Sequence, residues 1–170
     1  TTDFAKENIF NVLMGYTDFD GINALDLFAG TGSITLELLS RGCSSVTAVE
    51  KDREHHRFIL QCVGKIRGDE PGLGGGRPPA EGSEGPGVRI CCADVFRFMK
   101  TCRQQFDFIF ADPPYALKEL PTIPDLIFTH GLLAPGGIFV FEHGKDNDFS
   151  QHPRFVEHRS YGSVNFSIFR

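Results

Sequence analysis

Ala24-Leu25-Asp26-Leu27-Phe28 and Ala29-Gly30-Thr31-Gly32 are two adjoining stretches that decide the fold class of this chain. The first is a short apolar run, which predicts a buried β-strand. The second predicts a tight turn, because its two glycines let the backbone pass close to a ligand. A leucine-rich helical pattern follows from Ser33 to Arg41 and stops at Gly42. A strand, a glycine turn and a helix in this order predict the first unit of an α/β sheet.

The same alternation continues along the chain. Further strands are predicted over residues 45–49, 88–92, 106–111 and 137–142, and further helices over residues 1–15, 52–66, 95–102 and 124–130. Residues 155–158 and 164–169 alternate as a terminal antiparallel pair would. The sequence therefore predicts an α/β fold, with a doubly wound, mostly parallel, seven-stranded Rossmann-like sheet and an antiparallel C-terminal strand pair.

The length of 170 residues predicts a single domain over residues 1–170, with a core rich in its 17 phenylalanines. Residues 67–87 hold eight glycines and four prolines, a composition that predicts a flexible surface loop. No apolar run approaches the roughly 18 residues of a membrane span, and no signal peptide is visible. The chain begins at Thr1 without a methionine, so an N-terminal piece that precedes it is an open expectation.

Five cysteines form no CxxC pair and no Cys/His metal spacing. We interpret them as reduced structural thiols, and we expect a cytoplasmic monomer without metal or membrane partners. His55-His56 and Glu142-His143 have no partners at a ligand spacing, so we interpret them as surface or strand-end residues.

The formal net charge of −5 is unfavourable for an enzyme of nucleic acids, because phosphate contacts need clustered positive charge. Basic residues do cluster in two predicted helical segments. They are Lys51, Arg53, Arg57, Lys65 and Arg67 in one segment, and Arg97, Lys100 and Arg103 in the other. Both a local phosphate-binding face and a solvated helix surface fit these clusters.

Chemically interesting residues follow the ends of four predicted parallel strands: Gly30, Glu50, Asp94 and Asp112. In open α/β sheets the ligand lies at these carboxyl ends, where the strand order reverses. Glu50 comes 18 residues after Gly32, where a carboxylate can accept both hydroxyl protons of a ribose. Asp94 can accept from an adenine amine. Since Thr35 replaces the third small residue of the dinucleotide fingerprint, the pattern favours an adenosine ligand, and a nicotinamide dehydrogenase is the weaker alternative.

Asp112-Pro113-Pro114-Tyr115 ends the predicted strand over residues 106–111. The prolines fix their own φ and bias the preceding residue towards extended geometry. The Asp112 carboxylate and the Pro113 carbonyl would accept the two protons of a planar exocyclic amine, and Tyr115 would stack on its ring. Taken alone, a proline turn that simply ends a strand explains this motif equally well.

Together these motifs resemble the class I S-adenosylmethionine-dependent methyltransferases, and more narrowly the bacterial 16S ribosomal RNA guanine-N2 methyltransferases. The resemblance rests on Leu25 to Gly32, Glu50, Asp94 and Asp112 to Tyr115, and also on Thr1 to Asn11, Ser40 to Gly42, Val49 to Asp52 and Leu133 to Gly137. It covers nearly the whole chain outside the glycine-rich loop. It implies an RNA (guanine-N2-)-methyltransferase with S-adenosyl-L-methionine as cofactor, and ribosomal RNA or the assembling small ribosomal subunit as partner.

The resemblance also implies roles for individual residues. The expected cofactor-binding residues are Asp26, Phe28, Ala29, Gly30, Thr31, Gly32, Glu50, Lys51, Asp94, Val95 and Asp112, and the expected catalytic residues are Asp112, Pro113 and Tyr115. Within this set, Glu50 would hold the ribose and Asp94 with Val95 the adenine. The motifs do not select among planar amines, so methylation of DNA adenine or of a protein glutamine amide stays open. A catalytically silent methyltransferase-like scaffold stays open as well.

Overall fold

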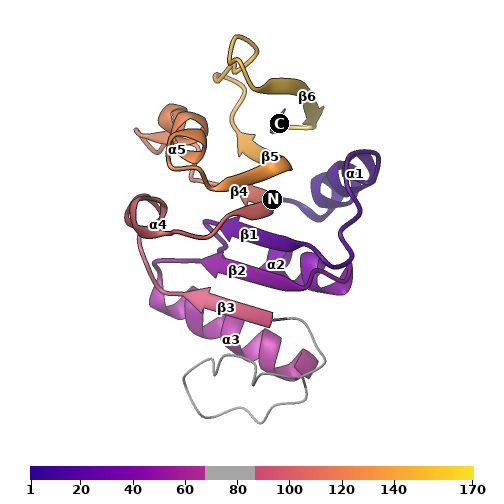
Figure 1. Cartoon of the computed structure of the whole chain (residues 1–170), viewed down its shortest axis with the longest axis vertical. Coiled ribbons are helices and arrows are strands. Elements are labelled where there is room, and N and C mark those ends of the chain that lie inside the picture. Colours follow the sequence, from indigo (N-terminus) through magenta and orange to yellow (C-terminus); the bar gives the residue numbers. More distant parts are fainter. Residues whose placement is uncertain (68–86) are drawn as a thin grey trace.

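Seven strands form one mixed sheet in the computed structural model, which describes residues 1–67 and 87–170 (Figure 1). The strand order is β3-β2-β1-β4-β5-β7-β6. The strands are β1 (Asn23–Leu27), β2 (Ser45–Val49), β3 (Gly87–Cys91), β4 (Phe106–Ala111), β5 (Leu133–His143), β6 (Phe155–Tyr161) and β7 (Val164–Phe169). The first five pair in parallel, whereas β7 is antiparallel to β5 and to β6. The predicted sheet and its antiparallel C-terminal pair are confirmed.

Helices cover both faces of this sheet. They are α1 (Asp3–Leu13), α2 (Ser33–Ser40), α3 (Arg53–Arg67), α4 (Val95–Thr101) and α5 (Ile123–Thr129), with a 3-10 turn η1 (Leu120–Thr122) before α5. Apolar residues of α1 and α2 pack with Phe108 and Phe110 on one face, where α3 extends the layer over β2 and β3. Residues of α4 and α5 pack with Ile109 and Phe139 on the other face. Successive side chains of β4 therefore pack alternately into the cores on the two faces of the sheet, as expected for a central parallel strand.

Phenylalanine dominates both cores, as the composition predicted. Most of the largest fully buried side chains are phenylalanines of β4, β5 and β7. Burial of each such ring contributes about 1.5–3 kcal/mol. The central strands, whose ends carry the site, therefore belong to the most deeply buried part of the described chain.

The carboxyl edge opens between β1 and β4. The chain runs from β1 outward to β2 and β3, and then returns to the other side of β1 to form β4. The connections that leave β1 and β4 therefore diverge to opposite faces, which is the place where open α/β sheets bind ligands.

Strand β5 differs from the prediction, which began it at Gly137 after a turn over residues 133–137. The structure includes that segment in β5 as an irregularity, because the register with β4 passes from Phe106–Leu133 to Phe108–Ile138. Gly136 has φ +79°, and a Cβ on Gly137 would lie 3.0 Å from the Asp107 carbonyl oxygen. The extra residues are accommodated where a glycine backbone can approach β4 closely.

The other differences are shorter. Strand β6 continues to Tyr161, three residues beyond its predicted end. Arg67 closes α3 and Gly87 opens β3, so the two ends of the predicted loop over residues 67–87 belong to regular elements. The rest of that loop lies outside the described residues. Of the helices in the described ranges, none combines the length and apolar character needed to cross a membrane.

Candidate active site

The glycine turn after β1 is held in a conformation that ordinary residues avoid. Phe28 has φ +60°, and Gly30 and Gly32 have φ +58° and +86°. For a bulky residue such as Phe28 this backbone region is strained, and strain of this kind gathers at functional sites. A Cβ on Gly30 would meet no described atom within 4 Å, whereas a Cβ on Gly32 would lie 3.0 Å from Ile59 of α3. Gly30 therefore borders open space, and Gly32 allows close packing against α3.

Glu50 at the end of β2 fixes this turn. The Gly30 N–H donates to Glu50 Oε2 at 2.7 Å, and the Asp52 N–H donates to Glu50 Oε1 at 3.0 Å. A carboxylate offers about four lone-pair sites, so each oxygen retains capacity for a further donor. The next residue, Lys51, is exposed. The prediction that Glu50 lies beside the glycine turn at the carboxyl edge agrees with this geometry.

Asp26 lies beneath the turn. Its side chain is 1% exposed, and the Thr35 hydroxyl donates to Asp26 Oδ2 at 2.7 Å. Burial raises the pKa of Asp26 to about 7, although the hydrogen bond from Thr35 acts in the opposite direction. Sequence reasoning noted Thr35 only as a departure from the dinucleotide fingerprint. The structure shows that Thr35 is the partner of Asp26 at the first turn of α2.

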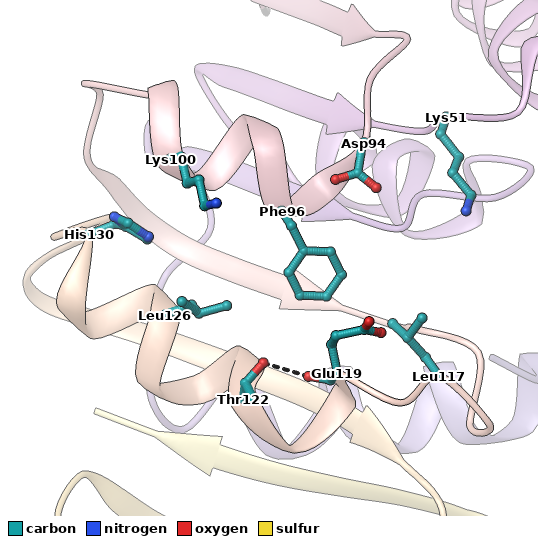
Figure 2. Close-up of a pocket in the computed structure, with 9 residues that line it drawn as sticks. All are labelled: Lys51, Asp94, Phe96, Lys100, Leu117, Glu119, Thr122, Leu126 and His130. Carbon is teal, nitrogen blue, oxygen red and sulfur yellow. Dashed lines mark hydrogen bonds between the residues drawn. The ribbon is translucent and has the colours of Figure 1, made fainter.

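Asp94 ends the connection from β3 and caps α4, because its carboxylate accepts the Arg97 N–H at 3.1 Å. It also lines a cavity of about 570 Å³ between α4 and the segment that leads into α5. Figure 2 shows Lys51 and Asp94 together at one end of this cavity and Lys100 and His130 at the other. Val95 is buried in the core cluster of α4 and α5.

The Phe96 ring is a feature of this cavity that sequence reasoning missed. It projects between α4 and the segment that carries Leu117 and Glu119 (Figure 2). It also meets the strained Phe28 in an edge-to-face contact, with the ring centroids 6.3 Å apart. Phe96 follows Asp94-Val95 directly in sequence, and this adjacency was the available signal. The cavity thus offers a flat apolar surface beside a carboxylate, which is suited to a heteroaromatic ring.

The Asp112–Tyr115 motif lies beside the glycine turn, as the sequence predicted. The Asp112 N–H donates to the Leu27 carbonyl at 3.3 Å, which joins the end of β4 to the residue before Phe28. Asp112 Oδ2 accepts the Thr1 hydroxyl at 3.0 Å, so the segment before α1 also reaches the site. Pro113 is buried, and no described residue donates a hydrogen bond to its carbonyl. An acceptor pair is therefore held at the end of the central strand.

Tyr115 stands at the open side of the motif with 44% of its surface exposed. A Cβ on Gly144 would lie 3.5 Å from its ring, so the Gly144 backbone packs against one side of the tyrosine. The Tyr115 hydroxyl donates to Glu142 Oε2 at 3.4 Å. Burial and the neighbouring carboxylates raise the pKa of the Tyr115 hydroxyl above its ordinary value, which keeps it a donor.

Glu142 was interpreted from the sequence as a surface or strand-end residue; it does lie at the end of β5, but it is not on the surface. It is only 2% exposed and lies beside Asp112 and Tyr115. Burial and the Asp112 carboxylate raise the pKa of Glu142 to about 8. Among the described residues, Glu142 Oε1 has no hydrogen-bond partner. A polar residue that ends a continuous apolar run was the sequence signal for this position.

The sequence profile of the family described as "Conserved hypothetical protein 95" matches residues 1–71 and 84–170, nearly the whole chain. The chain belongs to this family. One curated protein of similar sequence is "Putative rRNA methyltransferase YlbH" of Bacillus subtilis, which is 30% identical over 86% of this chain and 71% of that protein. "Ribosomal RNA small subunit methyltransferase D" of Escherichia coli is 24% identical over 86% of this chain and 65% of its own length.

Solved structures agree with the architecture of this family member. "Putative methyltransferase yhhF from Escherichia coli" has a TM-score of 0.79 at 22% identity, over 99% of this chain and 86% of that chain. SMU.776, described as a methyltransferase structure "complexed with SAH", has a TM-score of 0.70 at 14% identity, over 99% of this chain and 50% of that chain. At these identities the likeness shows the fold, and it confirms the class I methyltransferase resemblance at that level.

Proposed function

We propose that this chain is an S-adenosylmethionine-dependent RNA methyltransferase that modifies the exocyclic N2 amine of a guanine in small-subunit ribosomal RNA. The observation that carries the proposal is the position of the Asp112–Tyr115 motif directly beside the glycine turn, at the switch point between β1 and β4. The relative named for the small ribosomal subunit supports the choice of RNA. A monomer that acts in the cytoplasm is part of the same proposal.

The residues present fit the cofactor. The space in front of Gly30 is open, the Glu50 carboxylate has lone pairs left for ribose hydroxyls, and Asp94 with Phe96 borders a cavity suited to adenine. Asp26 lies under the turn, so its contribution is to hold Thr35 and the start of α2 in place. When bound, S-adenosylmethionine supplies an electrophilic methyl group.

The acceptor half of the site prepares the amine. An aryl amine is a weak nucleophile, because its lone pair is delocalised into the ring. Asp112 and the Pro113 carbonyl accept hydrogen bonds from the two N–H groups of the amine and so orient its lone pair. The Asp112 carboxylate also stabilises the positive charge that develops on nitrogen. Tyr115 stacks on the base, a contact worth about 1–3 kcal/mol per stacked base. Asp112 is also placed to accept the proton that the nitrogen loses.

The decisive experiment compares methyl acceptors. Radiolabelled methyl transfer is measured on naked 16S ribosomal RNA, on assembled small subunits and on DNA, followed by nucleoside analysis of the product. N2-methylguanine in RNA supports the proposal. Label in DNA adenine or in a protein amide would assign another acceptor. If the protein binds the cofactor but transfers no methyl group to any substrate, the catalytically silent scaffold is the remaining explanation.

RNA binding provides an independent check on the partner. Lys51, Arg53 and Arg57 are exposed on or next to α3, and Lys51 also lines the cavity beside Asp94. If they contact phosphates, RNA affinity falls steeply with added salt, and each charge removed lowers the slope of log affinity against log salt by about one. A slope that stays the same in the triple alanine variant would exclude these residues from the interface.

A further inference from the structure

The buried carboxyl of Glu142 is a group that the proposed reaction does not use. Its two oxygens have different surroundings: Oε2 accepts the Tyr115 hydroxyl at 3.4 Å, whereas Oε1 is buried and has no hydrogen-bond partner among the described residues. A buried polar atom without a partner is costly and needs an explanation. Asp112 is the neighbouring carboxylate. The Thr1 ammonium forms ion pairs with both side chains, with its nitrogen 3.0 Å from Asp112 Oδ2 and 3.8 Å from Glu142 Oε1.

A proton on Oε1 resolves this arrangement. The neutral carboxyl can then donate from Oε1 towards Asp112 while Oε2 still accepts from Tyr115, so that one side chain satisfies both neighbours. Burial and the negative charge of Asp112 both favour this neutral form, and they raise the pKa of Glu142 to about 8. The opposite position on the antiparallel neighbour β7 is Phe166, which carries no charge. The groups that face Glu142 are thus the Asp112 carboxylate, the Tyr115 hydroxyl and the Thr1 ammonium. The ammonium lowers the pKa of Glu142, but burial and Asp112 outweigh it.

We infer that Glu142 is a positioning residue whose protonated carboxyl bridges Asp112 and Tyr115 and fixes the two functional ends of the motif relative to each other. This inference rests on the proposed function, because the bridge matters for turnover only if Asp112 and Tyr115 hold the acceptor base. Loss of the proton replaces a donor–acceptor contact with two neighbouring negative charges. The bridge therefore opens as the pH rises through the titration of Glu142.

The first test needs no activity. In protein labelled with ¹³C at its carboxyl carbons, one glutamate signal should titrate near pH 8, and it should be missing in Glu142→Gln. In Asp112→Asn the same signal should titrate at lower pH, because the neighbouring negative charge is gone. If no glutamate titrates above neutral pH, or if Asp112→Asn leaves the titration in place, the bridge does not exist.

The second test uses the pH profile of methyl transfer. Wild-type kcat should fall as the pH rises through the titration of Glu142, whereas Glu142→Gln should retain most of kcat at neutral pH and lose the alkaline fall, since an amide both donates and accepts. Glu142→Ala should lose about 10²-fold in kcat at every pH, the size expected for misplaced reacting groups. Equal pH profiles in wild type and Glu142→Gln would reduce Glu142 to a structural role. If wild type transfers no methyl group, the proposed function fails while the carboxyl titration still reports on the bridge.

Discussion

The Glu50 carboxylate accepts the Gly30 N–H at 2.7 Å and so ties the end of β2 to the glycine turn that follows β1. Glu50 also accepts the Asp52 N–H, which precedes α3. One carboxylate therefore organises the turn and the start of the next helix while it faces the carboxyl edge of the sheet. Four predictions test this site.

Replacement of Glu50 should affect both the turn and the cofactor. Hydrogen bonds to a charged group are worth about 1.5–3 kcal/mol each, so Glu50→Ala should lower the free energy of unfolding by about that amount or more. We expect the affinity for S-adenosylmethionine, measured by calorimetry, to fall at least tenfold as the ribose contact is lost. Glu54→Ala, an exposed acid of α3, is the matched control and should change the affinity little. Wild-type affinity in Glu50→Ala would remove Glu50 from the cofactor site.

Gly30 and Gly162 form a matched pair for the space in front of the turn. Their φ angles are +58° and +62°, and a Cβ on either would meet no described atom within 4 Å. Alanine at either position should therefore lower the free energy of unfolding by a similar amount, about 1–2 kcal/mol, because the alanine would have to adopt the left-handed backbone conformation. Only Gly30→Ala should weaken binding of S-adenosylmethionine, since its methyl group enters the proposed ligand space. Equal cofactor affinity in the two variants would place the ligand elsewhere.

Asp112 should control turnover and leave cofactor binding largely intact. Asp112→Ala removes the acceptor for the amine proton and the negative charge near the reacting nitrogen, so we expect methyl transfer to become undetectable. The affinity for S-adenosylmethionine should stay within a few-fold of wild type. Calorimetry and labelled methyl transfer on the same preparation separate the two effects. Normal turnover in this variant would exclude Asp112 from catalysis.

Asp26 should make stability depend on pH. Because burial raises the pKa of Asp26 from 3.8 to about 7, the folded state holds more protons than the unfolded state between these values. Stability is therefore fully present below the unfolded pKa and falls as the pH rises towards 7, by an amount of the order of 4 kcal/mol. Asp26→Asn keeps an acceptor for Thr35 but does not titrate. Its stability relative to wild type, from denaturant unfolding at a series of pH values, should rise across this window and then level off.

A constant difference between Asp26→Asn and wild type over the whole pH series would show that Asp26 ionises normally in the folded protein. The difference between the two proteins is the useful quantity, because the remaining carboxylates titrate in both and cancel.

Most of the fold followed from local patterns. The strand over residues 106–111 and the final strand were predicted with the bounds that the structure shows, because apolar runs between turn signals mark them clearly. The segment over residues 133–137 was predicted as a turn, because its proline and glycines are turn residues. In the structure this segment pairs with β4 and forms an irregular first part of β5. Local turn preference and strand pairing compete here, and the neighbouring strand decides the outcome.

The candidate site also contains residues that the sequence could predict and residues that only the structure reveals. Gly30, Glu50, Asp94 and Asp112 could be predicted to lie together because each follows a strand, and parallel strands bring their carboxyl ends to one edge. Phe96, Thr35 and Glu142 were not recognised, because each gains its role from a partner on another element: Phe28, Asp26 and Tyr115. Sequence spacing does not report such contacts.

The sequence by itself determined the order of strands and helices, the glycine turn and the chemical groups at the strand ends, since hydrophobic periodicity and backbone preferences are local properties. Tertiary structure alone decided which of those groups are taken out of water and which meet. Burial beneath the turn raises the pKa of Asp26, and the pairing of β4 with β5 places Glu142 beside Asp112. Desolvation and the approach of like charges depend on distance in space, and that distance is set only when the sheet has formed.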